Sequence, residues 1–121
     1  MSNILIIDDD DDIRDMITIY LENASHTVTQ ASQGQDGVDL AKLSVPDLII
    51  LDINMPVMDG TRVIKELRDN QSTAKVPVIA LSAMNDTHMR DDMYQMGCDA
   101  YIIKPIDFEV LQAKIASLIS H

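Results

Sequence analysis

Four short runs of apolar residues constrain the fold of this chain more than any other feature. The runs are Ile4–Ile7, Leu48–Leu51, Val76–Leu81 (interrupted by Pro77) and Ala100–Ile103. Within each run apolar residues follow one another without alternation, which is typical of strands buried on both faces of a parallel sheet. A fifth segment, Thr27–Ala31, alternates instead and is expected to form an edge strand.

Segments with helical periodicity lie between and after these runs. Acidic residues Asp10–Asp12 open the first of them, where they meet the positive end of the helix dipole, and Gly97 is expected to cap the fourth. Strand and helix alternate five times, so we expect helices on both faces of the sheet. The apolar positions are Ile13, Met16, Ile17, Tyr20 and Leu21; Val38 and Ala41; Val63, Ile64 and Leu67; Met89, Met93 and Met96; and Val110, Leu111, Ile115, Leu118 and Ile119.

Length and charge narrow the class of protein. The 121 residues fit one domain, expected to span residues 1–121, and 46% of them are hydrophobic, which argues against disorder. A formal charge of −11 repels nucleic acids and anionic membrane surfaces, so neither is expected as a direct partner. Cys98 stands alone, and the chain has neither a basic leader nor the roughly 20 apolar residues of a membrane helix. We therefore expect a cytoplasmic protein.

Polar residues with useful chemistry follow four of the predicted strands. Asp8 and Asp9 follow the first, Asp52 the third, Ser82 ends the fourth, and Lys104 follows the fifth. In open parallel sheets, ligands bind beyond the carboxyl ends of the strands. The sequence thus predicts three carboxylates, a hydroxyl and an ammonium group at one edge of the sheet.

The three carboxylates are predicted to bind Mg²⁺. In a small space they repel one another unless a cation is present. No His or Cys follows these strands, which argues against zinc, whereas Mg²⁺ binds through one or two carboxylates and bridges to phosphate oxygens. Asp8, Asp9 and Asp52 are therefore the candidate ligands.

A carboxylate in this setting can also be the nucleophile of phosphoryl transfer, which forms an aspartyl-phosphate. The transition state spreads charge over the phosphoryl oxygens, so catalysis depends on positioning and charge neutralisation. Lys104 can supply a positive charge beside the cation, and Ser82 can donate a hydrogen bond to a phosphoryl oxygen. These residues predict a phosphoacceptor site.

Four motifs carry a resemblance to a known family. They are Ile-Leu-Ile-Ile-Asp8-Asp9, Leu51-Asp52-Ile-Asn-Met-Pro56-Val-Met-Asp59-Gly60, Ala80-Leu-Ser82-Ala83 and Tyr101-Ile-Ile-Lys104-Pro105. Over residues 3–119 the chain resembles a receiver domain of the two-component response regulators, with the extent of the single-domain chemotaxis type. Ser82 stands where that family more often has Thr, and it keeps the hydroxyl group.

The resemblance implies a flavodoxin-like, doubly wound, five-stranded parallel sheet of strand order 2-1-3-4-5. It implies phosphorylation of Asp52, with Mg²⁺ held by Asp8, Asp9, Asp52 and the backbone carbonyl of Asn54. The phosphoryl donor would be a sensor histidine kinase or a histidine phosphotransfer protein. The domain would catalyse only its own phosphorylation and dephosphorylation, and so would not be an enzyme with turnover.

The resemblance also implies how the site signals. Lys104 would pair with the phosphoryl group, and its bond to Pro105 would be cis. Ser82 would move toward the phosphoryl group and Tyr101 would swing inward. The readout would be the surface of the fourth helix, fifth strand and fifth helix, which would contact an output protein that the sequence does not identify.

Three alternatives concern the whole chain. It can be a receiver fragment of a larger hybrid kinase or transcription regulator. It can be an aspartate-nucleophile phosphatase, although that class needs a second Asp two residues after the nucleophile, where this chain has Asn54. A flavin-binding protein on the same fold needs a phosphate-binding loop after the first strand, but Asp8–Asp12 would repel the phosphate.

Simpler structural roles compete with function at single positions. Asp10–Asp12 and Asp59 are expected to cap helices, and the Met residues of the fourth helix are expected to pack in the core. Tyr101 can pack its ring in the sheet with its hydroxyl group in water. Lys104 can be a surface lysine, although its position after a buried strand favours a role at the site.

Overall fold

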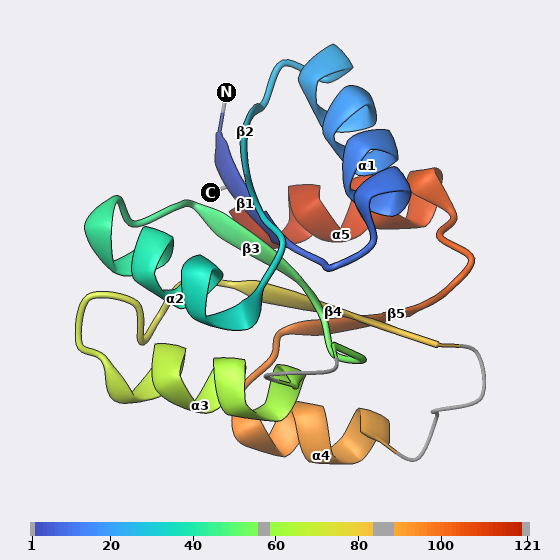
Figure 1. Ribbon diagram of the computed structural model, residues 1–121. Coiled ribbons are helices and arrows are strands. Elements are labelled where there is room, and N and C mark those ends of the chain that lie inside the picture. Colours follow the sequence, from blue (N-terminus) through green and yellow to red (C-terminus); the bar gives the residue numbers. More distant parts are fainter. Residues whose placement is uncertain (1, 56–58, 84–88, 120–121) are drawn as a thin grey trace.

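The apolar runs form one parallel sheet in a computed structural model of the chain, which describes residues 2–55, 59–83 and 89–119 (Figure 1). The strands are β1 (Asn3–Ile7), β2 (Thr27–Ala31), β3 (Leu48–Asp52), β4 (Val78–Ser82) and β5 (Ala100–Ile103). Their order across the sheet is β2-β1-β3-β4-β5, and every neighbouring pair is parallel. The predicted fold class and strand order are confirmed.

Five helices cover the two faces of this sheet. They are α1 (Asp11–Asn23), α2 (Gly34–Leu43), α3 (Gly60–Asp69), α4 (Met89–Met96) and α5 (Phe108–Ile119). Figure 1 shows α1 and α5 on one face and α2, α3 and α4 on the other. None of the helices in the described ranges is both long and apolar enough to cross a membrane.

Each face of the sheet has its own hydrophobic core because successive strand residues point to opposite sides. In β1, Ile4 and Ile6 pack in the core beneath α1 and α5, whereas Leu5 and Ile7 pack in the core beneath α2, α3 and α4. All four are buried. Burial on both faces explains why the strand sequences are continuously apolar.

Aspartate residues begin two of the helices, as expected. Asp10 is the N-cap of α1, and its carboxylate accepts hydrogen bonds from the backbone N–H groups of Asp12 and Ile13. Asp59 caps α3 by accepting from the backbone N–H of Arg62. At the other end of the domain, Gly97 follows α4 with a φ of 116°, a backbone conformation that favours glycine.

The structure differs from the sequence pattern in two details. The fourth strand begins at Val78 instead of Val76, because Pro77 has no N–H group to donate to a neighbouring strand. Met16 of α1 is 54% exposed and Val110 of α5 is 43% exposed, although both lie in the apolar sets of their helices. In α1 and α5 the buried stripe is narrower than the apolar pattern, whereas the apolar sets of α2 and α3 are fully buried.

Candidate functional site

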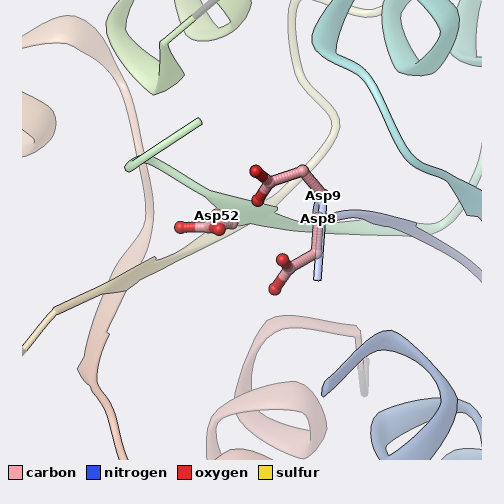
Figure 2. Close-up of side chains that lie close together, drawn as sticks. All are labelled: Asp8, Asp9 and Asp52. Atoms are coloured by element: carbon pink, nitrogen blue, oxygen red, sulfur yellow. The ribbon is translucent and has the colours of Figure 1, made fainter. Parts of the chain in front are cut away.

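Three carboxylates meet at the edge of the sheet where the strands have their carboxyl ends. Asp8 and Asp9 directly follow β1, and Asp52 is the last residue of the neighbouring strand β3. One carboxylate oxygen from each of the three lies within 4.8 Å of the others (Figure 2). The strand order reverses direction between β1 and β3, and such a position is the usual ligand site of this architecture.

Lys104 lies against two of these carboxylates. Its Nζ atom is 3.4 Å from Oδ2 of Asp52 and 3.6 Å from Oδ2 of Asp8. Asp8 is fully buried and Asp52 is 3% exposed, so both charges lie largely out of water. One ammonium group therefore faces two buried carboxylates, and with Asp9 the site has more negative than positive charge.

The environment of Asp8 strongly disfavours its ionised form. The pKa of Asp8 is raised to about 6, chiefly by burial and further by the charge of Asp52, although the hydrogen bond from Asp10 and the charge of Lys104 oppose the rise. Its Oδ1 atom accepts from the backbone N–H of Asp10 at 2.9 Å. Its Oδ2 atom is buried and has no hydrogen-bond partner in the part of the chain that the structure describes.

These observations fit a hard divalent cation. A buried carboxylate oxygen without a hydrogen-bond donor is costly, and a bound cation would remove that cost. The cluster offers only oxygen atoms, which suits Mg²⁺ or Ca²⁺ and not zinc. Asp9 is exposed to solvent, whereas the other two carboxylates are buried. The cluster can hold such a metal ion.

Asp52 is held in a defined orientation by its own loop. Its Oδ1 atom accepts a hydrogen bond of 3.0 Å from the backbone N–H of Asn54, while Oδ2 faces Lys104. The side chain of Asn54 in turn accepts a 2.9 Å bond from the backbone N–H of Ala83. This contact joins the loop after β3 to the loop after β4.

The remaining predicted residues lie on the two strands beyond β3. Ser82 is fully buried at the end of β4, and its hydroxyl group donates a long 3.3 Å bond to the carbonyl of Ala83. The backbone N–H of Lys104 donates to the carbonyl of Ser82 at 2.8 Å, and the Lys104–Pro105 peptide bond is cis. The loop after β5 thus lies beside the end of β4.

Tyr101 belongs to β5 and is 8% exposed. It is part of the core beneath α2, α3 and α4, and its ring centroid is 6.5 Å from that of Tyr94 in α4. The structure therefore gives one inward position of this ring, and an inward swing on phosphorylation stays a prediction. Pro56, which belongs to the second motif, lies outside the described residues.

Two contacts at the site were not predicted from the sequence. Asn54 was expected to contribute its backbone carbonyl, and the role of its side chain in joining two loops was missed. Arg14 was missed entirely, although its guanidinium group donates a 2.7 Å bond to the backbone carbonyl of Asp8. A basic residue in the second turn of an otherwise acidic helix start was the available signal for Arg14.

Comparison with known proteins identifies a family. The model of the response regulator receiver domain matches residues 4–116. Over 119 residues the chain is 40% identical to the DNA-binding dual master transcriptional regulator RpaA of Synechocystis, covering 98% of this chain and 49% of that protein. It is 34% identical to the response regulator ArlR of Staphylococcus aureus, covering 98% and 53%.

Solved structures have the same fold. The receiver domain of a Pseudomonas aeruginosa sensor histidine kinase, with a magnesium ion coordinated in its active-site cleft, aligns with a TM-score of 0.91 and 28% identity, covering 99% of this chain and 98% of that one. The Vibrio cholerae chemotaxis protein CheY4 aligns with a TM-score of 0.91 and 27% identity, covering 98% of both chains.

The chain spans about half the length of the curated relatives that it matches. One of these relatives is a DNA-binding regulator. The expectation that nucleic acid is excluded as a partner, which rested on net charge alone, therefore has no support from the comparisons. The net charge of −11 belongs to these 121 residues, and it says nothing about the other half of a longer relative that binds DNA.

Proposed function

The chain belongs to the response regulator receiver domains, and from this premise we propose that residues 1–121 form one phosphoacceptor domain in which Asp52 receives the phosphoryl group. The observation that carries the proposal is the pair of contacts from Lys104 Nζ to the buried carboxylates of Asp8 and Asp52. Phosphoryl transfer needs a positioned nucleophile and compensation of negative charge, and this arrangement offers both.

The chemistry assigns one bond formed and one bond broken. A carboxylate oxygen of Asp52 attacks the phosphorus of a phosphohistidine on a sensor histidine kinase or phosphotransfer protein. The P–N bond breaks, the imidazole leaves and takes up a proton, and an aspartyl-phosphate remains. The hydrogen bond from Asn54 fixes Oδ1 of Asp52, which limits rotation of the attacking group.

The other residues at the site would neutralise the charge of the phosphoryl group and hold it in position. Asp8, Asp9, Asp52 and the backbone carbonyl of Asn54 would hold Mg²⁺, which neutralises phosphoryl oxygens when bound. Lys104, which contacts the carboxylates of both Asp8 and Asp52, supplies a second positive charge. Ser82 donates a hydrogen bond to a phosphoryl oxygen after giving up its long contact with Ala83.

A phosphatase with turnover is disfavoured by the chemistry of residue 54. An amide group cannot protonate a leaving alcohol, and the Asn54 side chain is already engaged with the backbone of Ala83. We therefore propose that the domain catalyses only its own phosphorylation and dephosphorylation. Phosphorylation would shift the population between two conformers. The side chains of Ser82 and Tyr101 would have different positions in the two.

The output surface is proposed to lie on α4, β5 and α5. Each of these elements has one exposed large apolar side chain, namely Tyr94, Ile103 and Val110. The proposal follows from the family resemblance, and these side chains would offer apolar contacts to a partner on that surface. The output partner is an unidentified protein or another part of a longer chain, and the site of action is the cytoplasm.

The experiment is phosphorylation with acetyl phosphate or a phosphorylated histidine kinase domain, in Mg²⁺ and in EDTA. We expect the mass of one phosphoryl group per chain, stable in mild acid and labile in base, in Mg²⁺ only. Asp52→Asn should abolish it, whereas Asp59→Asn, which alters a capping carboxylate in the same loop region, should not. A label that persists in Asp52→Asn would refute the assignment, and many turnovers of a phosphate ester would restore the phosphatase alternative.

A further inference from the structure

The guanidinium group of Arg14 joins three parts of the chain around the candidate cation site. Its Nη1 atom donates to the backbone carbonyl of Asp8, its Nη2 atom to the carboxylate of Asp11, and its Nε atom to the side-chain oxygen of Gln30 at 2.9 Å. These partners belong to the end of β1, the first turn of α1 and the edge strand β2. The Arg14 side chain is only 12% exposed.

A closed ring of hydrogen bonds fixes the position of this guanidinium group. Gln30 accepts from Arg14 and donates from its amide nitrogen to the hydroxyl oxygen of Thr18 at 2.7 Å. Thr18 then donates to the backbone carbonyl of Arg14 at 2.8 Å. Because each member is held by the next, the Arg14 side chain cannot leave Asp8 without breaking the ring.

The choice of acceptor matters for the chemistry of the site. Arg14 bonds the backbone carbonyl of Asp8, whereas Lys104 faces its carboxylate. A guanidinium group on the carboxylate would compete with a cation for the same oxygen atoms. On the carbonyl it fixes the main chain, and the carboxylate oxygens stay available to a metal ion.

The backbone between β1 and α1 is thereby fixed at both sides of Asp9. The N–H of Asp8 donates to the carbonyl of Ala31 in β2, its carbonyl accepts from Arg14, and the N–H of Asp10 bonds the Asp8 carboxylate. Asp9 lies between these fixed points, and its own side chain is exposed. Arg14 thus restrains the segment that presents two of the three candidate ligands.

We propose that Arg14 is a positioning residue for cation binding, which it supports by holding the main chain of Asp8 and Asp9 in the ligand geometry. The inference rests on the proposed function, because it assumes that the carboxylate cluster binds Mg²⁺. Residues that orient metal ligands without touching the metal typically contribute about 10-fold or more to metal affinity. A loss of about tenfold is expected here.

The sign of the effect separates positioning from simple electrostatics. If Arg14 acted only through its charge, removing it would strengthen cation binding, since a positive charge near the site would be lost. If Arg14 positions the ligands, removing it weakens binding in spite of the charge. Arg14→Lys keeps the charge but lacks the fork that reaches Asp8 and Gln30 together, so it should also weaken binding.

The experiment measures Mn²⁺ binding by the electron paramagnetic resonance signal of the free ion, with Mg²⁺ as the competitor. Arg68→Ala is the matched control. Arg68 also lies against backbone carbonyls, those of Val76 and Gly97, but these precede β4 and β5 at the opposite edge of the sheet. The Arg68→Ala substitution removes the same charge and the same kind of contact as Arg14→Ala. It should leave cation affinity within about twofold of wild type.

Phosphorylation by acetyl phosphate provides the second readout. Arg14→Ala should raise the Mg²⁺ concentration needed for half the maximal rate about tenfold, and leave the rate at saturating Mg²⁺ within about threefold of wild type. Gln30→Ala, which keeps the guanidinium group but opens the ring, should give a smaller change in the same direction. Should Arg14→Ala fail to fold, Arg14→Lys and Gln30→Ala decide the question by these criteria.

Two failures are distinguishable. Unchanged or tighter cation binding in the folded Arg14 variants overturns the positioning role while the proposed function stands. Absence of Mn²⁺ and Mg²⁺ binding in the wild-type chain overturns the cation site and this inference together.

Discussion

Replacing Asp8 with Asn should stabilise the metal-free protein at neutral pH. The carboxylate of Asp8 is buried beside Asp52, and its pKa is raised from 3.8 to about 6 by burial and by that neighbouring charge. A raised pKa means that the folded state disfavours the ionised form. At pH 7, where Asp8 is ionised, its charge therefore lowers the free energy of unfolding. Asn removes this charge and can keep the hydrogen bond that Oδ1 accepts from Asp10.

The size of the effect follows from the two pKa values. Moving the pKa from 3.8 to about 6 corresponds to about 3 kcal/mol of lost stability above pH 6. This is the maximum gain from the substitution, because Lys104 loses one of its two carboxylate partners in the variant. For a domain of this length, about 3 kcal/mol raises Tm by on the order of 10 °C.

The pH dependence has a definite sign. Well below pH 3.8 the carboxyl group is protonated in both the folded and unfolded states, so the penalty is absent. It develops as pH rises from 3.8 to about 6 and is complete above that. The advantage of Asp8→Asn should therefore be largely lost at pH 4.

Urea unfolding in EDTA at pH 7.5 and at pH 4, followed by circular dichroism, measures this difference. Adding Mg²⁺ at pH 7.5 should stabilise the wild type more than the variant, since binding to the folded state adds stability by mass action. Asp59→Asn is the matched control with the opposite sign. Hydrogen bonds from Thr61 and Arg62 lower the pKa of Asp59, so its ionised form favours folding and the variant should be less stable at pH 7.5. An Asp8→Asn protein that is less stable than wild type in EDTA at pH 7.5 would refute the reasoning.

Three further predictions concern the core and its connections. Gly60→Ala should cost about 1–3 kcal/mol in urea unfolding and weaken Mn²⁺ binding, because the new Cβ atom would lie 2.6 Å from the backbone Cα of Ile53, next to Asp52, the proposed phosphoacceptor. Thr73→Val should cost about 1–3 kcal/mol in the same unfolding assay, because the buried carbonyl of Leu67 loses the 2.6 Å bond from the Thr73 hydroxyl group. Burial raises the pKa of Cys98 from 9.0 to about 11, so alkylation by iodoacetamide at pH 7.5 should be on the order of 100-fold slower in the folded protein than in urea.

Each of these predictions has a result that contradicts it. For the glycine, Gly37→Ala is the control: its nearest contacts would all be with the side chain of Ile7, so it should lower stability but leave cation affinity within about twofold. Equal Mn²⁺ affinities in wild type and Gly60→Ala would contradict the coupling to Asp52. A Thr73→Val protein as stable as wild type, or a native Cys98 that reacts as fast as the unfolded one, would contradict the other two.

The sheet and the polar residues at the carboxyl ends of its strands were predictable, because both follow from one physical constraint. Strands buried on both faces need continuous apolar sequence, so the first polar residue after each run marks the end of a strand. Asp8, Asp52 and Lys104 were found in this way, and the structure brings their side chains together. The apolar run does not fix the first residue of a strand as closely: β4 begins at Val78, after Pro77, and not at Val76.

The contacts among side chains in the loops were not predictable from periodicity. The bond between Asn54 and Ala83 joins two loops that are 29 residues apart, and the bond from Arg14 to Asp8 depends on how the chain turns between β1 and α1. The apolar pattern also does not report the width of a buried stripe, so it did not distinguish the exposed Met16 from the buried Ile17. Geometry within loops decides these details, and a single sequence carries little signal for it.

The contacts of Arg68 determine how α4 can be displaced. The guanidinium group donates two bonds to the carbonyl of Gly97, directly after the helix, and others to Val76 and Asp99. Moving the carboxyl end of α4 requires breaking these bonds, whereas its first turn at Met89 lies far from them along the helix. A change that starts beside Ser82 would therefore displace the first turn of α4 more than its carboxyl end.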